Sequence, residues 1–118
     1  MPSNVELSVI EMPLVLGVIF SIIGIIFYFF PPKKINYIYG YRTSTSMESQ
    51  ERWDFAQKYS AIKMIQGSVF LLAVSGLGLL FSLSQSQQVV IGFTALIVHI
   101  VGMFYLTEKA LKKQFPKS

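Results

Sequence analysis

The fold is decided by residues 13–30, PLVLGVIFSIIGIIFYFF, which carry no charged side chain. A helix of about 20 mostly apolar residues is long enough to cross a bilayer. Pro31 and Pro32 follow directly, and proline ends a helix because it lacks a backbone N–H and its ring clashes with the preceding turn. The residues before the run include Glu6 and Glu11 but no Lys or Arg, which disfavours a cleaved signal peptide. We therefore predict a first, retained transmembrane helix over about 13–30.

Two further apolar runs, about 64–83 and 89–106, have the length and composition of transmembrane helices. Only a short polar turn, residues 84–88, separates them, so they should form an antiparallel hairpin. The expected fold is an all-α membrane protein with three transmembrane helices in a single domain. A cytoplasmic loop with an interfacial helix should fill residues 31–63, and a basic tail should follow from residue 107.

The composition supports this class of protein. The 118 residues are 53% hydrophobic and only 14% charged, whereas an ordinary soluble domain has roughly 25% charged residues. A chain this short could not bury so much apolar surface in a soluble core. The absence of cysteine excludes a disulfide scaffold and a zinc ribbon. The aromatic content and the low charge exclude disorder.

The basic residues lie on one side of the three predicted spans. All ten fall between the first two spans or after the third: Lys33, Lys34, Arg42, Arg52, Lys58, Lys63, Lys109, Lys112, Lys113 and Lys117. Because short loops rich in Lys and Arg stay cytoplasmic, we expect a multi-pass protein of the cell membrane with its N-terminus outside and its C-terminus in the cytoplasm. The net charge of +4 then serves contacts with anionic lipids rather than with nucleic acid.

Residues 33–46, KKINYIYGYRTSTS, are unlike a flexible linker. Three tyrosines surround Gly40, which permits a tight turn or a close backbone approach because it has no Cβ atom. Arg42 is followed by four hydroxyl side chains at 43–46. A guanidinium group with several hydroxyl donors suits a phosphate or a carboxylate. The loop is therefore a candidate binding site for a partner or an anion.

A helix should begin after this loop. Thr45 and Glu48 have the spacing of a capping box, which predicts an amphipathic helix from about Met47 at the membrane surface. This helix either bends into the second span or runs straight on as that span. Four basic side chains next to the membrane are candidates for contacts with lipid head groups: Lys33, Lys34, Arg52 and Lys58.

Simple anchoring explains part of this pattern. Aromatic side chains at a membrane interface act as anchors, and Lys and Arg there satisfy the positive-inside rule. Anchoring accounts for the lysines. For Trp53, anchoring and a role in binding are equally good explanations, but anchoring requires neither Asn36 nor Gly40. The candidate partner-binding or anion-binding site therefore comprises Asn36, Gly40, Tyr41, Arg42, Thr43, Ser46 and Trp53.

This pattern resembles the SdpI family of small bacterial membrane proteins. The resemblance rests on Asn36, Tyr39, Gly40, Tyr41, Arg42, Thr43, Ser46, Trp53 and Ala56, with Pro32 and Lys33 ahead of them and hydrophobic spans on both sides. It implies an integral membrane immunity protein that protects a cell from a secreted toxic peptide and that can recruit a transcriptional repressor to the membrane. The implied partners are therefore a toxic peptide and a cytoplasmic repressor, besides membrane lipids.

Small residues inside the predicted spans favour close helix packing. They line one face of each span: Gly17, Ser21 and Gly24 in the first, Ser68, Ser75 and Gly78 in the second, and Gly92, Ala95, His99 and Gly102 in the third. A compact three-helix bundle is expected from these faces, which also suit a homodimer.

His99 is the only histidine and lies near the centre of its span. It is either an intramembrane switch that changes charge near neutral pH or a neutral side chain hydrogen-bonded to a Ser or Tyr of a neighbouring helix. No second His, no Cys and no carboxylate of a span accompanies it, so we expect neither a metal site nor another cofactor.

These features predict a protein that is not an enzyme. The spans contain no Asp or Glu, and the sequence offers no nucleophile–base pair for a phosphate-cleaving enzyme. The expected function is immunity to a membrane-active toxic peptide, with signalling to a cytoplasmic regulator. The alternative is an anionic-lipid binding protein or a small transporter in which the Arg42 loop holds a lipid phosphate.

Overall fold

Three long α-helices account for most of the chain. The computed structural model describes residues 4–78, 80–81 and 83–116, with residues 4–12 and Gln85 described by their backbone alone. The helices are α1 (Asn4–Phe29), α2 (Gln50–Gly78) and α3 (Gln85–Gln114). The predicted all-α, three-helix architecture is confirmed.

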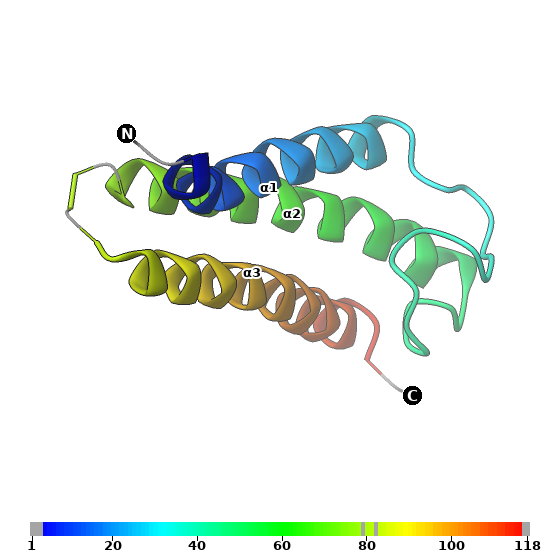
Figure 1. The fold of residues 1–118 in the computed structure, drawn as a ribbon. Helices are drawn as coiled ribbons and strands as arrows, with labels where there is room; N and C mark the ends of the chain where they lie inside the picture. The colour runs from blue at the N-terminus through cyan, green and yellow to red at the C-terminus, as the bar shows by residue number, and fades with distance from the viewer. Residues whose placement is uncertain (1–3, 79, 82, 117–118) are drawn as a thin grey trace.

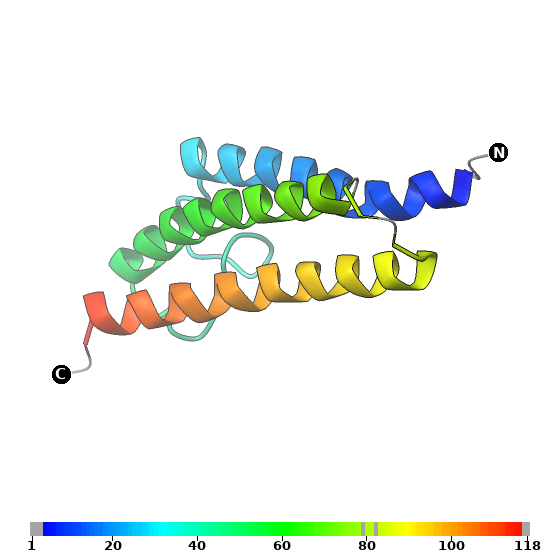
Figure 2. The same ribbon diagram turned by 90° about the vertical axis from the view of Figure 1, so that its left-hand side faces the viewer.

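The helices lie lengthwise in an elongated bundle of 60 × 25 × 20 Å, with α2 between α1 and α3 (Figure 1). Both α1 and α3 run antiparallel to α2. The connection from α2 to α3 lies at one end of the bundle, near the N-terminus. The loop of residues 30–49 and the C-terminus lie at the other end, which we call the loop end (Figure 2).

The outer surfaces of the helices are apolar. Large side chains such as Ile22 and Val101 remain 52% and 59% exposed, respectively. Both α2 and α3 are long and apolar enough to cross a membrane, whereas the apolar part of α1, Pro13–Phe29, is shorter. A helix suits this setting because it satisfies its backbone hydrogen bonds within the segment. A third crossing, by α1, stays a prediction.

The start of α2 differs from the expectation. The helix begins at Gln50, and the backbone N–H of Arg52 donates to the Ser49 hydroxyl at 3.2 Å, as at a helix N-cap. The predicted capping box of Thr45 and Glu48 is wrong, because Thr45 lies in a tight turn of the loop. From Gln50 the chain continues as one α-helix to Gly78. Of the two predicted alternatives, a bend into the second span or a straight continuation as that span, the structure shows the straight continuation.

The third helix extends beyond residues 89–106 at both ends. Its N-cap is Ser84, whose hydroxyl accepts the Gln87 N–H at 3.1 Å while the Gln87 side chain accepts the Ser84 N–H at 3.0 Å. Most of the expected turn at 84–88 is therefore the first turn of α3. At the loop end the helix continues to Gln114, where Lys112 and Lys113 in its last turn complement the negative end of the helix dipole.

Small residues bring α1 and α2 into close contact, as expected from the sequence. The Ser21 hydroxyl donates to the Ser68 hydroxyl at 2.7 Å, a direct hydrogen bond between the two helices. A Cβ atom on Gly24 would lie 2.7 Å from the Ile65 side chain and 3.2 Å from the Ala61 carbonyl oxygen. This stripe of α1 is therefore occupied within the chain, and the homodimer through small-residue faces stays a prediction.

This packing makes two glycines respond differently to the same change. Gly24→Ala should lower the stability of the bundle by about 1–2 kcal/mol, because the neighbouring Ala61 carbonyl is backbone and cannot move away. Gly76→Ala should be neutral or stabilising by up to about 1 kcal/mol, because a Cβ there meets nothing within 4 Å and alanine is the better helix former. Unfolding of the two variants in mild detergent measures this contrast. Equal effects would contradict the close approach of α1 and α2.

Candidate functional site

The loop of residues 30–49 folds back against α2 at Tyr41. The amide side chain of Gln57, which is buried on α2, accepts the Tyr41 backbone N–H at 2.7 Å and donates to the Tyr41 carbonyl oxygen at 2.8 Å. Gly40 makes this approach feasible. It has a φ of +106°, which side chains disfavour, and a Cβ there would lie 2.7 Å from the Gln57 amide oxygen. Of the two roles predicted for Gly40, a tight turn or a close backbone approach, the structure shows the close approach.

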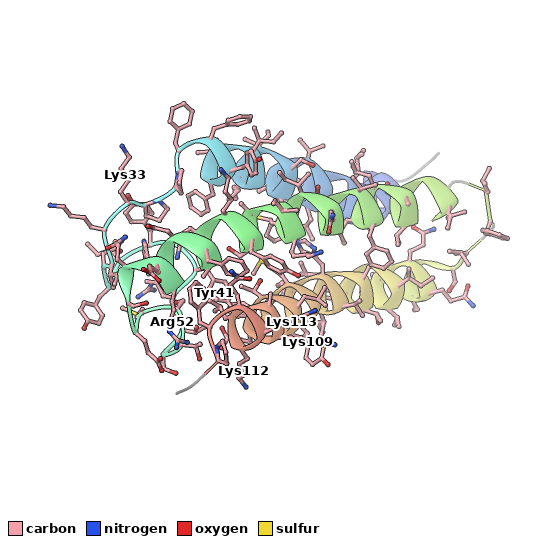
Figure 3. All side chains as sticks on the ribbon, turned by 180° about the vertical axis from the view of Figure 1, so that it is seen from behind. Lys33, Tyr41, Arg52, Lys109, Lys112 and Lys113 are labelled. Carbon is pink, nitrogen blue, oxygen red and sulfur yellow. The ribbon has the colours of Figure 1, made fainter. Side chains whose placement is uncertain are left out.

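The loop is also attached to α3 through a carboxylate. The Tyr41 hydroxyl and the Thr43 hydroxyl both donate to Oε2 of Glu108, at 2.7 and 2.8 Å. The ring of Tyr41 packs on Phe104 at 5.2 Å between centroids. Figure 3 shows Tyr41 beside the last turns of α3. A single loop residue therefore connects α2 to α3.

Burial raises the pKa of Tyr41 well above its ordinary value of about 10, and the hydrogen bond to Glu108 and the charge of that carboxylate raise it further. The phenol is therefore held protonated as a donor. An ionised Glu108 is the natural acceptor, because hydrogen bonds to a charged partner are stronger than neutral ones.

Ser46 and Thr43 fix the shape of the loop next to this carboxylate. Ser46 is fully buried, and its hydroxyl accepts the Thr43 N–H at 2.9 Å and lies 3.1 Å from the Tyr41 carbonyl oxygen, to which it can donate. In return, the Thr43 hydroxyl oxygen accepts the Ser46 N–H at 3.1 Å. These residues thus have internal partners.

Two further residues of the predicted site hold the first half of the loop. Trp53 is fully buried, so it does not act as an anchor at the membrane surface, and its indole N–H donates to the Pro32 carbonyl oxygen at 2.7 Å. Asn36 accepts the backbone N–H groups of Ile38 and Tyr39 at 2.9 and 2.8 Å. A side chain that bonds to the backbone two residues on is typical of an Asx turn.

The basic residues of the loop end have different surroundings. Arg42 is exposed and donates through Nη1 to the Tyr37 carbonyl oxygen at 2.6 Å. Arg52 lies 3.5 Å from the Glu48 carboxylate, in an ion pair, and Lys58 lies over the Tyr28 ring at 4.9 Å. The side chains of Lys33 and Lys34 are exposed; Lys117 lies outside the described residues.

His99 lies apart from the loop, at a point where all three helices meet. The imidazole is buried, packs on Phe20 of α1 at 4.7 Å between centroids, and occupies the space where a Cβ on Gly67 of α2 would be. In the described part of the chain, its Nδ1 atom has no hydrogen-bond partner. For this nitrogen, the structure does not show the hydrogen bond to a Ser or Tyr that was one of the two alternatives for His99, and a role as a switch stays a prediction.

The residues at the loop end form a hydrogen-bond network that attaches the loop to α2 and α3. All seven residues of the predicted site contribute a side-chain hydrogen bond or a required backbone conformation to the loop, and the Arg42 side chain is exposed as well. The sequence reasoning missed Gln57 and Glu108. Gln57 could have been noticed as a polar residue that shares a helix face with Trp53 and Ser60, whereas no local signal marks Glu108.

These features define a small helical membrane protein whose loop is bound to its own bundle by buried polar contacts. The chain belongs to the SdpI/YfhL protein family, which matches residues 33–106, so the predicted resemblance is confirmed. It is similar to the uncharacterized protein YfhL of Bacillus subtilis (strain 168), with 43% identity over 99 residues that cover 84% of each chain. No solved structure matches the chain significantly.

The role of Glu108 can be tested by removing its charge. Glu108→Gln should destabilise the protein by about 1–2 kcal/mol, because two hydroxyl donors lose a charged acceptor and keep at best a neutral one. Glu51→Gln is the matched control. That side chain is exposed in the first turn of α2, and its charge there is worth only a few tenths of a kcal/mol. Comparable losses in both variants would contradict a special role for Glu108.

The raised pKa of Tyr41 predicts a loss of stability in alkali. Above about pH 10 the unfolded chain ionises this tyrosine while the folded chain keeps the proton, so rising pH favours unfolding. The stability conferred is complete below pH 10 and decreases above it. Tyr41→Phe should show a shallower decrease than the wild type in unfolding measured over this range. Parallel pH profiles would contradict the burial and bonding of the phenol.

Proposed function

We propose that this chain is a non-enzymatic protein of the cell membrane that protects the cell from a membrane-active toxic peptide. The observation that carries the proposal is membership of the SdpI/YfhL family over residues 33–106, a family that is named for immunity proteins. The network at the loop end supports it, because the motif residues serve to hold the loop in one conformation.

A fixed loop favours partner binding because a preorganised surface loses less conformational entropy on association. Arg42 is the residue of the motif that is available for this purpose. Its Nη1 bond to the Tyr37 carbonyl holds one side of the guanidinium group, and the exposed remainder can donate to a carboxylate or phosphate. We assign Arg42 to partner contact, and Tyr41, Thr43 and Ser46 to positioning it. The partner would be the toxic peptide or a cytoplasmic repressor.

The distribution of charge supports one orientation. Basic side chains of the loop, of the first turn of α2 and of the last turns of α3 gather on the half of the bundle that contains the loop: Lys33, Arg52, Lys109, Lys112 and Lys113 (Figure 3). Under the positive-inside rule, this end lies in the cytoplasm, and α1 crosses the membrane from a start outside the cell.

A second candidate function is an anionic-lipid binding protein or a small transporter, with Arg42 holding the lipid phosphate. The exposed guanidinium group favours it, since Arg binds phosphate oxygens through two parallel hydrogen bonds. The two functions differ in what Arg42 must recognise, and a resistance assay separates them.

The proposal predicts that Arg42 is required for protection but not for folding. Cells that lack the gene should lose membrane potential when they are exposed to purified membrane-permeabilising peptides, and the wild-type protein should restore it for at least one of them. Arg42→Ala should abolish this restoration while the protein accumulates normally. Lys109→Ala, which removes an exposed charge at the same end, is the control and should protect. A fluorescent membrane-potential dye measures each case.

Full protection by Arg42→Ala would overturn the role of the loop. If the wild-type protein protected against no peptide but bound an acidic lipid through Arg42, the second candidate function would replace the first.

A further inference from the structure

A groove of about 740 Å³ lies where α1 ends and the loop begins. Its apolar lining includes Phe29, Phe30, Ile38 and Tyr39, and Lys33 and Lys34 also line it. Arg42 does not line it. The groove is therefore distinct from the surface assigned above to a partner.

The apolar lining of this groove is unusually exposed. Phe29, Phe30 and Ile38 are 67%, 79% and 83% exposed, respectively. Phe29 and Phe30 lie at the end of the apolar helix α1, where a membrane protein meets the head-group region of the bilayer, and Ile38 of the loop lines the same groove. Exposed large apolar side chains gathered in one place are typical of a site that contacts a membrane or another molecule.

The two lysines that line the groove supply positive charge that the described residues do not neutralise. The structure describes an ion pair for Arg52, but none for Lys33 or Lys34 within its described residues. An ammonium group in a groove with an apolar lining complements an acidic phospholipid, because one molecule offers both a phosphate anion and acyl chains.

The backbone that carries the lysines is held from several sides. The Gln50 side chain donates to the Lys33 carbonyl oxygen at 2.6 Å, and the Asn36 amide donates to the Lys34 carbonyl oxygen at 2.9 Å. Tyr39 packs on Phe27 of α1 at 6.4 Å between centroids. The groove is thus formed before any ligand arrives, which lowers the entropic cost of binding.

We propose that this groove binds one acidic phospholipid, with its phosphate on Lys33 and Lys34 and the start of its acyl chains against Phe29, Phe30 and Ile38. The site goes beyond the proposed resistance function and does not depend on it. Its failure is distinguishable from failure of that function, because binding is measured on the purified protein without any toxic peptide.

The test titrates phosphatidylglycerol into the full-length protein in a neutral detergent and counts bound lipid by native mass spectrometry. Lys33→Gln/Lys34→Gln should weaken the tightest binding by about 25-fold, since each lysine near a lipid head group contributes about fivefold. Lys112→Gln/Lys113→Gln is the matched control: it removes the same charge from exposed side chains at the same end of the bundle. It should change this binding less than threefold. Emission from Trp53, the only tryptophan, reports that each variant is folded.

Two further arms separate a lipid site from a general anion site. Ile38→Ser should weaken phosphatidylglycerol binding although it leaves both lysines in place. Inorganic phosphate in large excess should not displace the lipid. The proposal is overturned if the two double variants bind phosphatidylglycerol equally weakly. It is also overturned if inorganic phosphate displaces the lipid, or if phosphatidylcholine binds as tightly as phosphatidylglycerol.

Discussion

The hydrogen bonds from Tyr41 and Thr43 to one carboxylate oxygen of Glu108 are the interaction on which the loop end depends. The chain itself joins α2 to α3 at one end of the bundle. At the opposite end Tyr41 joins them, because its backbone is bonded to Gln57 of α2 and its side chain to Glu108 of α3. Without these hydrogen bonds of Tyr41, α3 would be held to α2 at the loop end mainly by apolar contacts. Such contacts give little preference for one helix position in a bilayer, where lipid is as apolar as the protein.

Small and polar residues set the helix positions elsewhere in the bundle. The Ser21–Ser68 hydrogen bond and the stripe around Gly24 set the spacing between α1 and α2. The buried His99 ring, which fills the space left by Gly67, sets the position of α3 against α1 and α2. In this family member, small and polar residues therefore specify how the helices meet, while many of the large apolar side chains face outward. The motif of the loop extends this principle beyond the spans, and it leaves Arg42 and the Lys33–Lys34 groove as the surfaces available to other molecules.

The sequence predicted the architecture and the special character of the loop, because both depend on local properties. Long apolar runs predict helices by their length, and Gly40 predicts a turn or a close backbone approach by its missing Cβ atom. The role of Glu108 could not be predicted, because its contact with Tyr41 spans 67 positions in the chain and depends on the rotation of α3. The capping box of Thr45 failed for another reason. Its spacing to Glu48 satisfies the rule for a helix cap, but the Thr43 hydroxyl bonds to Glu108 of α3, and local bonds between Thr43 and Ser46 hold this segment in a turn. Local rules thus placed the elements, whereas the contacts between elements required the structure.

The central claim is that Tyr41 and Glu108 act as one unit, and a double-mutant cycle measures this most directly. The free energy of unfolding would be determined in mild detergent for the wild type, Tyr41→Phe, Glu108→Ala and the double variant. Because Tyr41→Phe keeps the ring against Phe104, the cycle isolates the hydroxyl–carboxylate bond. We predict a coupling energy of about 1–3 kcal/mol, as is usual for residues in one hydrogen-bond network. Effects that add to within about 0.5 kcal/mol would contradict the account and leave the loop without its attachment to α3.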